Sequence, residues 1–313
     1  MRARPGSRRQ PDWECRAASS NELFFQKLDF ENRAKRKAEF WIQGVGAWGF
    51  MQGNGDTAGL SRTLGGFMAG ADYRLAPNWF AGIAGGFTSS SVAIGERLSA
   101  STISSAHVAG YTGASFGPWN IRAALSASFN SVNATRTVSF PGFIDALSTN
   151  YLATTTQLFG EIGYALTFGR FAAEPFAGLS FVHLDAGGFT EHGTPGVAAL
   201  TSSGNSDDIG YSVLGARAAT YFDLTDSMVL TPHVSVAWQH AYGDVAPTTP
   251  LAFASNGATF STTALPLAQN AALLEAGVSL RFNQQLAFDL SYLGQVASGL
   301  QDTWLTGRLR LRF

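Results

Sequence analysis

The chain has 313 residues and is 45% hydrophobic, yet only 14% of its residues are charged, against about 25% in a typical soluble domain. Its formal net charge is −1, and its single cysteine, Cys15, excludes a disulfide framework or a cysteine-rich zinc site. No segment approaches the ~18 uninterrupted apolar residues of a transmembrane helix. Few charges without an apolar helix are typical of a membrane β-barrel, in which lipid-facing residues alternate with polar ones.

Charge is concentrated at the N-terminus. Residues 1–40 hold 10 of the 21 basic and 6 of the 22 acidic residues, and no lysine follows Lys37. Basic arms can bind nucleic acid or anionic lipid, but no nucleic-acid-binding motif follows this one, and we expect no nucleic-acid partner. Residues 1–20 contain two prolines and five arginines, and we expect them to be disordered. Because they have a positive segment without an apolar one after it, we interpret the chain as a fragment of a longer exported protein.

Residues 21–38 predict one amphipathic helix. Leu23, Phe24, Leu28 and Ala34 fall roughly on one helical face. Asn21 and Glu22 suit a helix N-terminus, and the following basic cluster suits a C-terminus because of the helix dipole. The polar and basic residues of this segment that we single out are Lys27, Asn32, Arg33, Lys35, Arg36 and Lys37.

From residue 39 onward the hydrophobic period is two, which indicates β-strands. Twelve candidate strands follow and nothing helical interrupts them, so the fold class is all-β, an antiparallel twelve-stranded transmembrane barrel over residues 39–313. The strands are expected at about 39–50, 61–73, 79–90, 102–116, 119–131, 152–168, 171–186, 207–222, 229–241, 270–282, 285–296 and 302–313.

The connections between these strands alternate in length. Those after the even strands are short: "RLAPN", "GP", "GR", "DLTDSM" and "NQ". Most of those after the odd strands are expected to be long and polar, at "MQGNGDTAGL", near 91–101, and at 132–151, 187–206 and 242–269. Short turns on one side and long loops on the other are typical of bacterial outer-membrane barrels, whose turns are periplasmic and whose loops are extracellular.

The alternation also predicts which residues face the lumen. A lipid-facing arginine at the bilayer midplane costs about 2–4 kcal/mol, so the arginines of the final "RLRLRF" must point inward, while Leu309, Leu311 and Phe313 face lipid. The same parity places charges of both signs inside, which suits a watery channel or a polar plug. The expected lumen residues are Arg122, Glu161, Glu275, Arg281, Asp289, Arg308, Arg310 and Arg312, together with Asp72; parity is weaker for Asp72 and Glu161.

Six tryptophans lie near predicted strand ends, where interfacial aromatic girdles occur in membrane barrels. The alternative is that each is an ordinary core residue. The six are Trp41, Trp48, Trp79, Trp119, Trp238 and Trp304.

Three patterns imitate catalytic or cofactor motifs. "GVGAWG" matches GxGxxG, but a dinucleotide site needs a helix to open at the glycines, and another turn follows instead. "GASFG" matches the nucleophile elbow around Ser115, yet a turn into another strand follows rather than a helix. The five histidines lack paired ligand spacing. We therefore expect no catalytic residues, no cofactor and no metal.

Taken together, these segments resemble the C-terminal translocator domain of type V secretion autotransporters. The resemblance rests on the helix-like entry at 21–38, the first strand and loop "FWIQGVGAWGFMQGNGDTAGLSR", the hairpin "GGFMAGADYRLAPNWFAGIAGGFTSS" and the terminal "RLRLRF". It covers residues 21–313, and its most specific part is that second hairpin.

The resemblance implies an outer-membrane barrel with a helix threading its pore, through which an N-terminal passenger reached the cell surface. Residues 1–20 would then be the remnant of that passenger, and the pore-facing charges would dock the helix. Leu309, Leu311 and Phe313 would form the signal that the barrel-assembly machinery recognises. Implied partners are outer-membrane lipid, that machinery, periplasmic chaperones and the chain's own passenger, with a monomeric barrel.

Two alternatives remain open from the sequence. Some autotransporters cut the passenger at an asparagine of the helix. Asn21 and Asn32 are present here, but the helix segment contains no Asn-Asn pair, so an uncut passenger is equally allowed. The second alternative is a porin or adhesin-like barrel without a passenger, in which the charges only hydrate the lumen, and the upstream sequence would distinguish these classes.

Overall fold

The computed structural model describes residues 38–53 and 57–313. The predicted disordered segment 1–20 and most of the predicted helix 21–38 lie outside the described residues. Ala38, which the sequence analysis assigned to that helix, is instead the first residue of a strand. Among the described residues, no helix is both long and apolar enough to cross a membrane.

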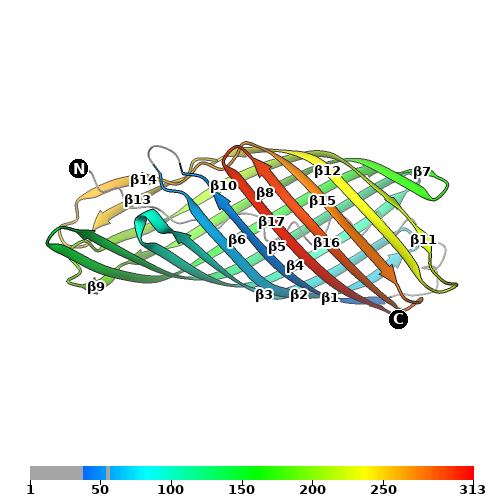
Figure 1. Cartoon of the computed structure of the whole chain (residues 1–313), viewed down its shortest axis with the longest axis horizontal. Coiled ribbons are helices and arrows are strands. Elements are labelled where there is room, and N and C mark those ends of the chain that lie inside the picture. The colour runs from blue at the N-terminus through cyan, green and yellow to red at the C-terminus, as the bar shows by residue number, and fades with distance from the viewer. Residues whose placement is uncertain (1–37, 54–56) are drawn as a thin grey trace.

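The described chain forms one closed antiparallel β-barrel with strongly tilted strands (Figure 1). Its wall consists of twelve long strands, each here called a stave together with any short strand that continues it after a break in the strand. These are β1 (Ala38–Met51), β2 (Leu60–Ala76), β3 (Trp79–Ile94), β4 (Ser99–Phe116), β5 (Trp119–Phe140), β6 (Phe143–Tyr164) with β7 (Leu166–Phe168), β8 (Phe171–Thr190) with β9 (His192–Thr194), β10 (Leu200–Thr220) with β11 (Phe222–Asp223), β12 (Val229–Gly243), β15 (Asn270–Arg281), β16 (Leu286–Ala297) and β17 (Leu300–Arg312).

Each stave pairs with its neighbour in the sequence, and β1 pairs with β17 to close the barrel. Closure leaves no unpaired edge along the shared height of the wall, as a membrane-spanning sheet requires. The first and last strands end together: the amide of Phe313 donates to the carbonyl oxygen of Ala38 at 3.0 Å. The predicted twelve-stranded all-β barrel is therefore confirmed.

The two ends of the barrel differ. At one end, here called the short-turn end, the connections lie between residues 76 and 79, 116 and 119, 168 and 171, 223 and 229, and 281 and 286. This matches the five short connections expected from the sequence. Both Ala38 and the C-terminus lie at this end (Figure 1).

At the opposite end, here called the long-hairpin end, the long connection predicted after the first strand is confirmed, since β1 ends at Met51 and β2 begins at Leu60. The other four predicted loops are occupied in large part by strands instead. The region 132–151 is a regular hairpin in which β5 and β6 are 22 residues each and only Pro141 and Gly142 turn. Gly142 has φ +85°, which glycine adopts without strain. These segments read as loops because their exposed face carries polar residues such as Asn133, Thr135 and Ser148, so the apolar half of the alternation is lost while backbone pairing continues.

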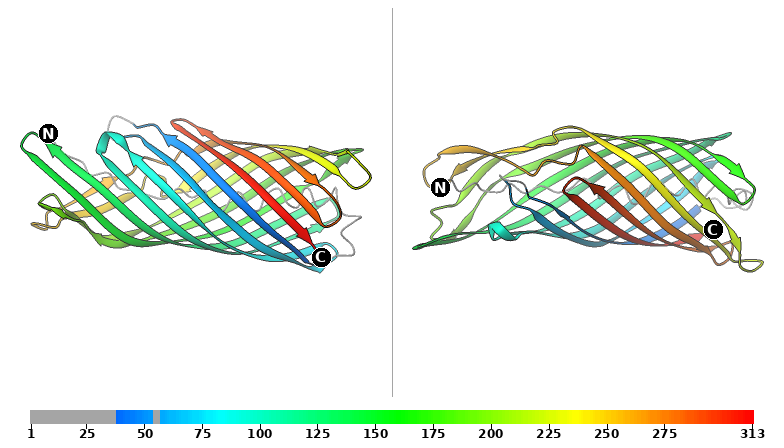
Figure 2. Two further views of the ribbon diagram at one scale, coloured as in Figure 1. Left: turned by 60° about the horizontal axis from the view of Figure 1, so that its bottom comes forward. Right: turned by 45° about the horizontal axis from the view of Figure 1, so that its top comes forward.

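Strands also occupy much of the other regions that were expected to be loops. The region 91–101 is strand on both sides of a 3-10 turn, η1 (Gly95–Arg97), and β9 and β10 occupy much of 187–206. The region 242–269 contains a hairpin of β13 (Thr248–Phe253) and β14 (Thr259–Thr263), and β13 also pairs with β10. Figure 2 shows that these hairpins extend well beyond the short β16–β17 hairpin, so the rim at this end is slanted.

Residue parity separates the two faces of the wall. Large apolar side chains such as Ile83, Leu125 and Leu179 are 56–71% exposed on the outside. Polar and charged side chains are buried inside. Four of the six tryptophans, Trp48, Trp79, Trp119 and Trp238, are 46–50% exposed and lie on the outer face near strand ends, as expected for a girdle. Trp41 and Trp304 are instead buried in the barrel.

Candidate functional site: the charged lumen

The lumen near the short-turn end holds a buried cluster of two arginines and two glutamates. Arg122 on β5 contacts Glu161 on β6 and Glu174 on β8, the latter at 2.9 Å. Arg217 on β10 contacts the same two carboxylates, with Glu174 at 2.7 Å. Their side chains are at most 3% exposed. Because the charges balance and each carboxylate contacts both guanidinium groups, the cluster meets the condition under which buried charge is tolerated.

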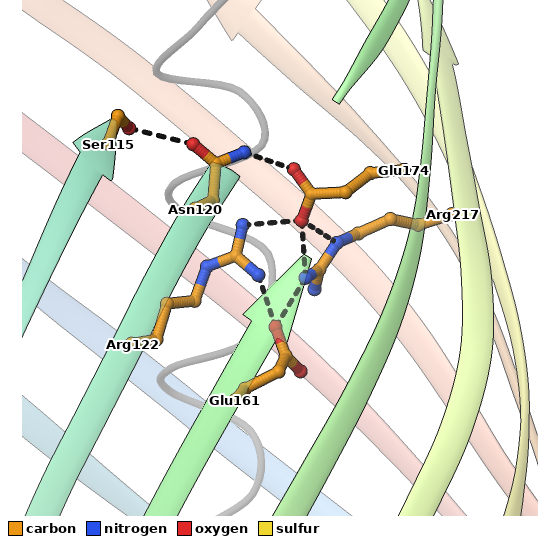
Figure 3. Close-up of polar contacts among 6 residues, drawn as sticks. All are labelled: Ser115, Asn120, Arg122, Glu161, Glu174 and Arg217. Carbon is orange, nitrogen blue, oxygen red and sulfur yellow. Dashed lines mark hydrogen bonds and ion pairs between the residues drawn. The ribbon is translucent and has the colours of Figure 1, made fainter. Parts of the chain in front are cut away.

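The cluster extends through neutral side chains to β4 (Figure 3). The amide of Asn120 donates to Glu174, and the hydroxyl of Ser115 donates to the Asn120 carbonyl oxygen at 2.7 Å. The ring of Phe176 lies 4.4 Å from the Arg217 guanidinium carbon and adds a cation–π contact. The network thus joins five neighbouring staves, β4, β5, β6, β8 and β10.

A glycine makes this reach possible. Glu174 crosses from β8 over Gly163 of β6 to Asn120 of β5, and a Cβ built on Gly163 would lie 2.4 Å from the Glu174 Oε1. Asn120 and Gly163 are opposite each other in the ladder. Any larger residue at 163 would occupy the path of the glutamate side chain.

The C-terminal arginines also face the lumen and contact the wall. Arg308 donates to the Gln43 Oε1 at 2.7 Å and lies 4.9 Å from the Trp41 ring centroid. Arg310 makes two bonds of 2.7 Å to Asp289. These contacts account for arginine at alternate positions in a lipid-spanning strand: the apolar residues between them lie on the outer face, where Leu309, Leu311 and Phe313 are 38–66% exposed.

The remaining predicted lumen residues are more scattered. Arg312 pairs with Glu39 across the junction of β17 and β1. Glu275 lies 3.8 Å from His233 and is mostly buried. Arg281 is partly exposed at the end of β15. The structure therefore brings Arg122 and Glu161 into one cluster, whereas Glu275 and Arg281 lie apart from it.

Two tryptophans were misassigned by the sequence analysis. Trp41 and Trp304 are 5% and 2% exposed and lie inside the barrel rather than in a girdle. The Trp41 Nε1 donates to the Tyr111 hydroxyl at 2.8 Å, and that hydroxyl donates to Asp72. Position near a strand end says nothing about which face a residue occupies. Parity with Arg308 and Arg310 in the same strand would have placed Trp304 inward, whereas β1 contains no arginine to give that signal for Trp41.

Sequence reasoning also missed Glu174 and Arg217. Each is the lone charge in an apolar strand segment, "FAAEPF" and "GARAAT". The argument used for Arg122 applies to both, because a charge on the lipid face is costly. That signal was available in the sequence and was not used for these two positions.

The motif around Ser115 has no catalytic geometry. The Ser115 hydroxyl donates a hydrogen bond to the amide oxygen of Asn120, which cannot act as a general base. The residue lies at the end of β4, before the turn into β5. The "GVGAWG" glycines lie within β1 rather than before a helix. In the described part of the chain, no group of three or more His, Cys, Asp or Glu side chains suits a metal ion.

A closed twelve-stave barrel with an apolar outer face and a charged, internally paired lumen defines a transmembrane β-barrel of the outer-membrane type. The sequence places it more narrowly. Residues 40–293 match the family model described as the autotransporter beta-domain. The chain belongs to that family, whose beta-domains export a passenger domain across the outer membrane.

Known relatives agree with this assignment. An extracellular serine protease of Serratia marcescens is 31% identical over 273 residues, covering 87% of this chain and 26% of that protein. The chain therefore spans about a quarter of the length of that relative, and the activity in its name belongs to that whole protein. In this family the beta-domain is the translocating part rather than the enzymatic one.

Solved structures share the fold. The translocator domain of the autotransporter NalP from Neisseria meningitidis has a TM-score of 0.69 at 13% identity and covers 93% of this chain and 96% of its own. The beta-domain of the Bordetella autotransporter BrkA has a TM-score of 0.69 at 14% identity and covers 88% and 100%. At these identities the likeness is one of fold alone.

Proposed function

We propose that this chain conducts its own N-terminal passenger to the cell surface and then anchors it in the outer membrane, with the passenger side extracellular. The observation that carries the proposal is the start of β1 beside Phe313, at the short-turn end. Short turns are periplasmic in bacterial outer-membrane barrels. A passenger joined to β1 and displayed outside would therefore have to pass along the lumen.

The segment 21–37 is the part of the chain suited to remain in the lumen, as a helix ending before β1. Its basic residues Lys35, Arg36 and Lys37 complement the carboxylates of the inner wall, among which Glu275 lies outside the cluster around Arg122. Opposite charges attract strongly where water is limited. The wall charges thus serve both to hydrate the lumen and to hold the helix.

Ion conductance in planar bilayers tests the plug. Deleting residues 21–37 should raise single-channel conductance several-fold, because the segment then no longer obstructs the lumen. Deleting residues 2–20 is the matched control and should leave conductance unchanged. Equal conductance with and without residues 21–37 would contradict the proposed plug.

Surface display tests the direction of export. An epitope fused before residue 1, behind a signal peptide, should be removed by protease added to intact cells. An epitope protected in intact cells but cleaved after lysis would indicate a porin-like barrel without export. With either outcome, insertion of the barrel into the outer membrane would also show that the barrel itself engages the assembly machinery. Leu309, Leu311 and Phe313 are the proposed signal for that step.

A further inference from the structure

The junction of β1 and β17, here called the seam, differs from every other strand junction of the wall. All other neighbouring staves are consecutive in the chain and joined by a connection, whereas β1 and β17 are the first and last. In a hairpin the connection sets the register. At the seam no connection does, so the side chains themselves must select it.

One level of the seam carries an unusual arrangement. Arg62 of β2, Gly49 of β1 and Asp302 of β17 are directly opposite one another in the two ladders. Arg62 reaches across the glycine to Asp302, with Nε donating to Oδ1 at 2.9 Å and a terminal nitrogen 2.6 Å from Oδ2. The two side chains are 3% and 6% exposed. The ion pair therefore spans three strands and both sides of β1.

The contact between Arg62 and Asp302 requires a glycine at position 49. A Cβ built on Gly49 would lie 1.6 Å from the Asp302 Oδ1 and 2.8 Å from the Gln301 carbonyl oxygen. No side chain can stand there while Asp302 keeps its place. If β17 slipped by two residues, Asp302 would face Ala47 or Met51 instead, and each has a side chain where the carboxylate now lies.

The next level of the seam has the same preference for one register. Trp304 is opposite Ala47, and both pack with Leu64 of β2 in a buried cluster. A two-residue slip would place the indole against Val45 or Gly49 and either overfill or empty this site. A one-residue slip is excluded separately, because it would turn every inward arginine of β17 toward lipid.

We propose that Arg62, Gly49 and Asp302 form a register key that sets the alignment of β1 on β17 when the barrel closes. Because register offset around a closed barrel and barrel diameter are linked, the key also sets the width of the lumen. It is a property of barrel closure and does not depend on which passenger the chain exports or on whether a helix fills the pore.

Disulfide trapping of the seam tests the key. In a Cys15→Ser background, the in-register pair Ile42→Cys with Leu309→Cys should cross-link in preference to Ile42→Cys with Gly307→Cys or with Leu311→Cys. The full chain is assembled in outer membranes, and the yields of the three pairs give a register ratio. Gly49→Ala should lower the in-register share relative to the shifted pairs by about tenfold, since overpacking commonly costs more than 1 kcal/mol.

Gly46→Ala is the matched control, because it lies on the same strand and a Cβ there meets nothing within 4 Å. It should leave the register ratio unchanged. Asp302→Asn, which keeps the side-chain volume, should shift the ratio in the same direction as Gly49→Ala but less. If Gly49→Ala yields no folded barrel, the Asp302→Asn ratio decides. A register ratio equal to that of the parent in Asp302→Asn, or in both variants, would overturn the proposal.

Discussion

Charged side chains cross a glycine in two regions of the lumen, and the two crossings have different tasks. In the cluster around Arg122, Glu174 crosses Gly163 between strands that consecutive turns already hold together. At the seam, Arg62 crosses Gly49 to a strand from the other end of the chain. Where turns set the register, a buried ion network can only stabilise it. Where no turn exists, a similar network can also select it.

The two regions also differ in how much charge depends on one residue. Glu174 serves two buried arginines and one asparagine, so its removal affects three partners at once. The seam divides its polar contacts among separate levels, at Asp302, Gln43 and Glu39. We therefore expect larger losses of stability from the cluster around Arg122 and larger losses of register from the seam.

The largest expected effect on stability is that of Glu174→Gln. The change leaves Arg122 and Arg217 sharing the single carboxylate of Glu161, and an uncompensated buried charge costs about 3–5 kcal/mol. Guanidinium unfolding of the full chain in detergent micelles, followed by tryptophan fluorescence, should show the midpoint falling accordingly. An unchanged midpoint would mean that water reaches the cluster, and that the cluster around Arg122 contributes no more to stability than the ion pairs of the seam.

Gly163→Ala should have an intermediate effect and tests the comparison most directly. The added methyl group must displace Glu174, and such overpacking costs about 1–3 kcal/mol. Register should nevertheless persist: the pair Ile162→Cys with Ala177→Cys should still cross-link in preference to Ile162→Cys with Leu179→Cys. A shifted cross-link here would remove the distinction between turn-connected strands and the seam.

The smallest expected effect is that of Arg170→Ala at the short-turn end. Arg170 and Asp223 are 3.5 Å apart, and their side chains are 63% and 53% exposed. Exposed ion pairs contribute about 0–1 kcal/mol, so the unfolding midpoint should barely move, and added salt should shrink the small difference further by screening the pair. A loss comparable to that of Glu174→Gln would show that burial does not govern these pairs.

The sequence contained enough information for the number of staves and for the short-turn end. Alternation of apolar and polar residues reports a strand with lipid on one face, and the turn residues at 117–118 and 169–170 are unambiguous. The same alternation assigned Arg308 and Arg310 to the lumen, because the cost of charge in lipid leaves one choice.

What could not be predicted has a common physical cause. Beyond the apolar band, strands such as β5 and β6 carry polar residues on their exposed face, so their composition resembles that of loops. The contacts across Gly49 and Gly163 depend on the relative register of strands that are not adjacent, which one sequence does not reveal. Arg62 and Asp302 are 240 positions apart in the sequence, and no local sequence pattern predicts their pairing.

The length of the β5–β6 hairpin has a practical consequence. A transmembrane β-strand needs about 9–11 residues, and each of these strands has 22, so roughly half of each lies outside the bilayer. Their turn, Pro141–Gly142, lies at the other end of β5 from Arg122, and β1, β2, β3 and β4 separate β5 from the seam. A peptide tag inserted there would be carried clear of the lipid headgroups, and the barrel could then serve as a display scaffold whose cargo leaves the channel untouched.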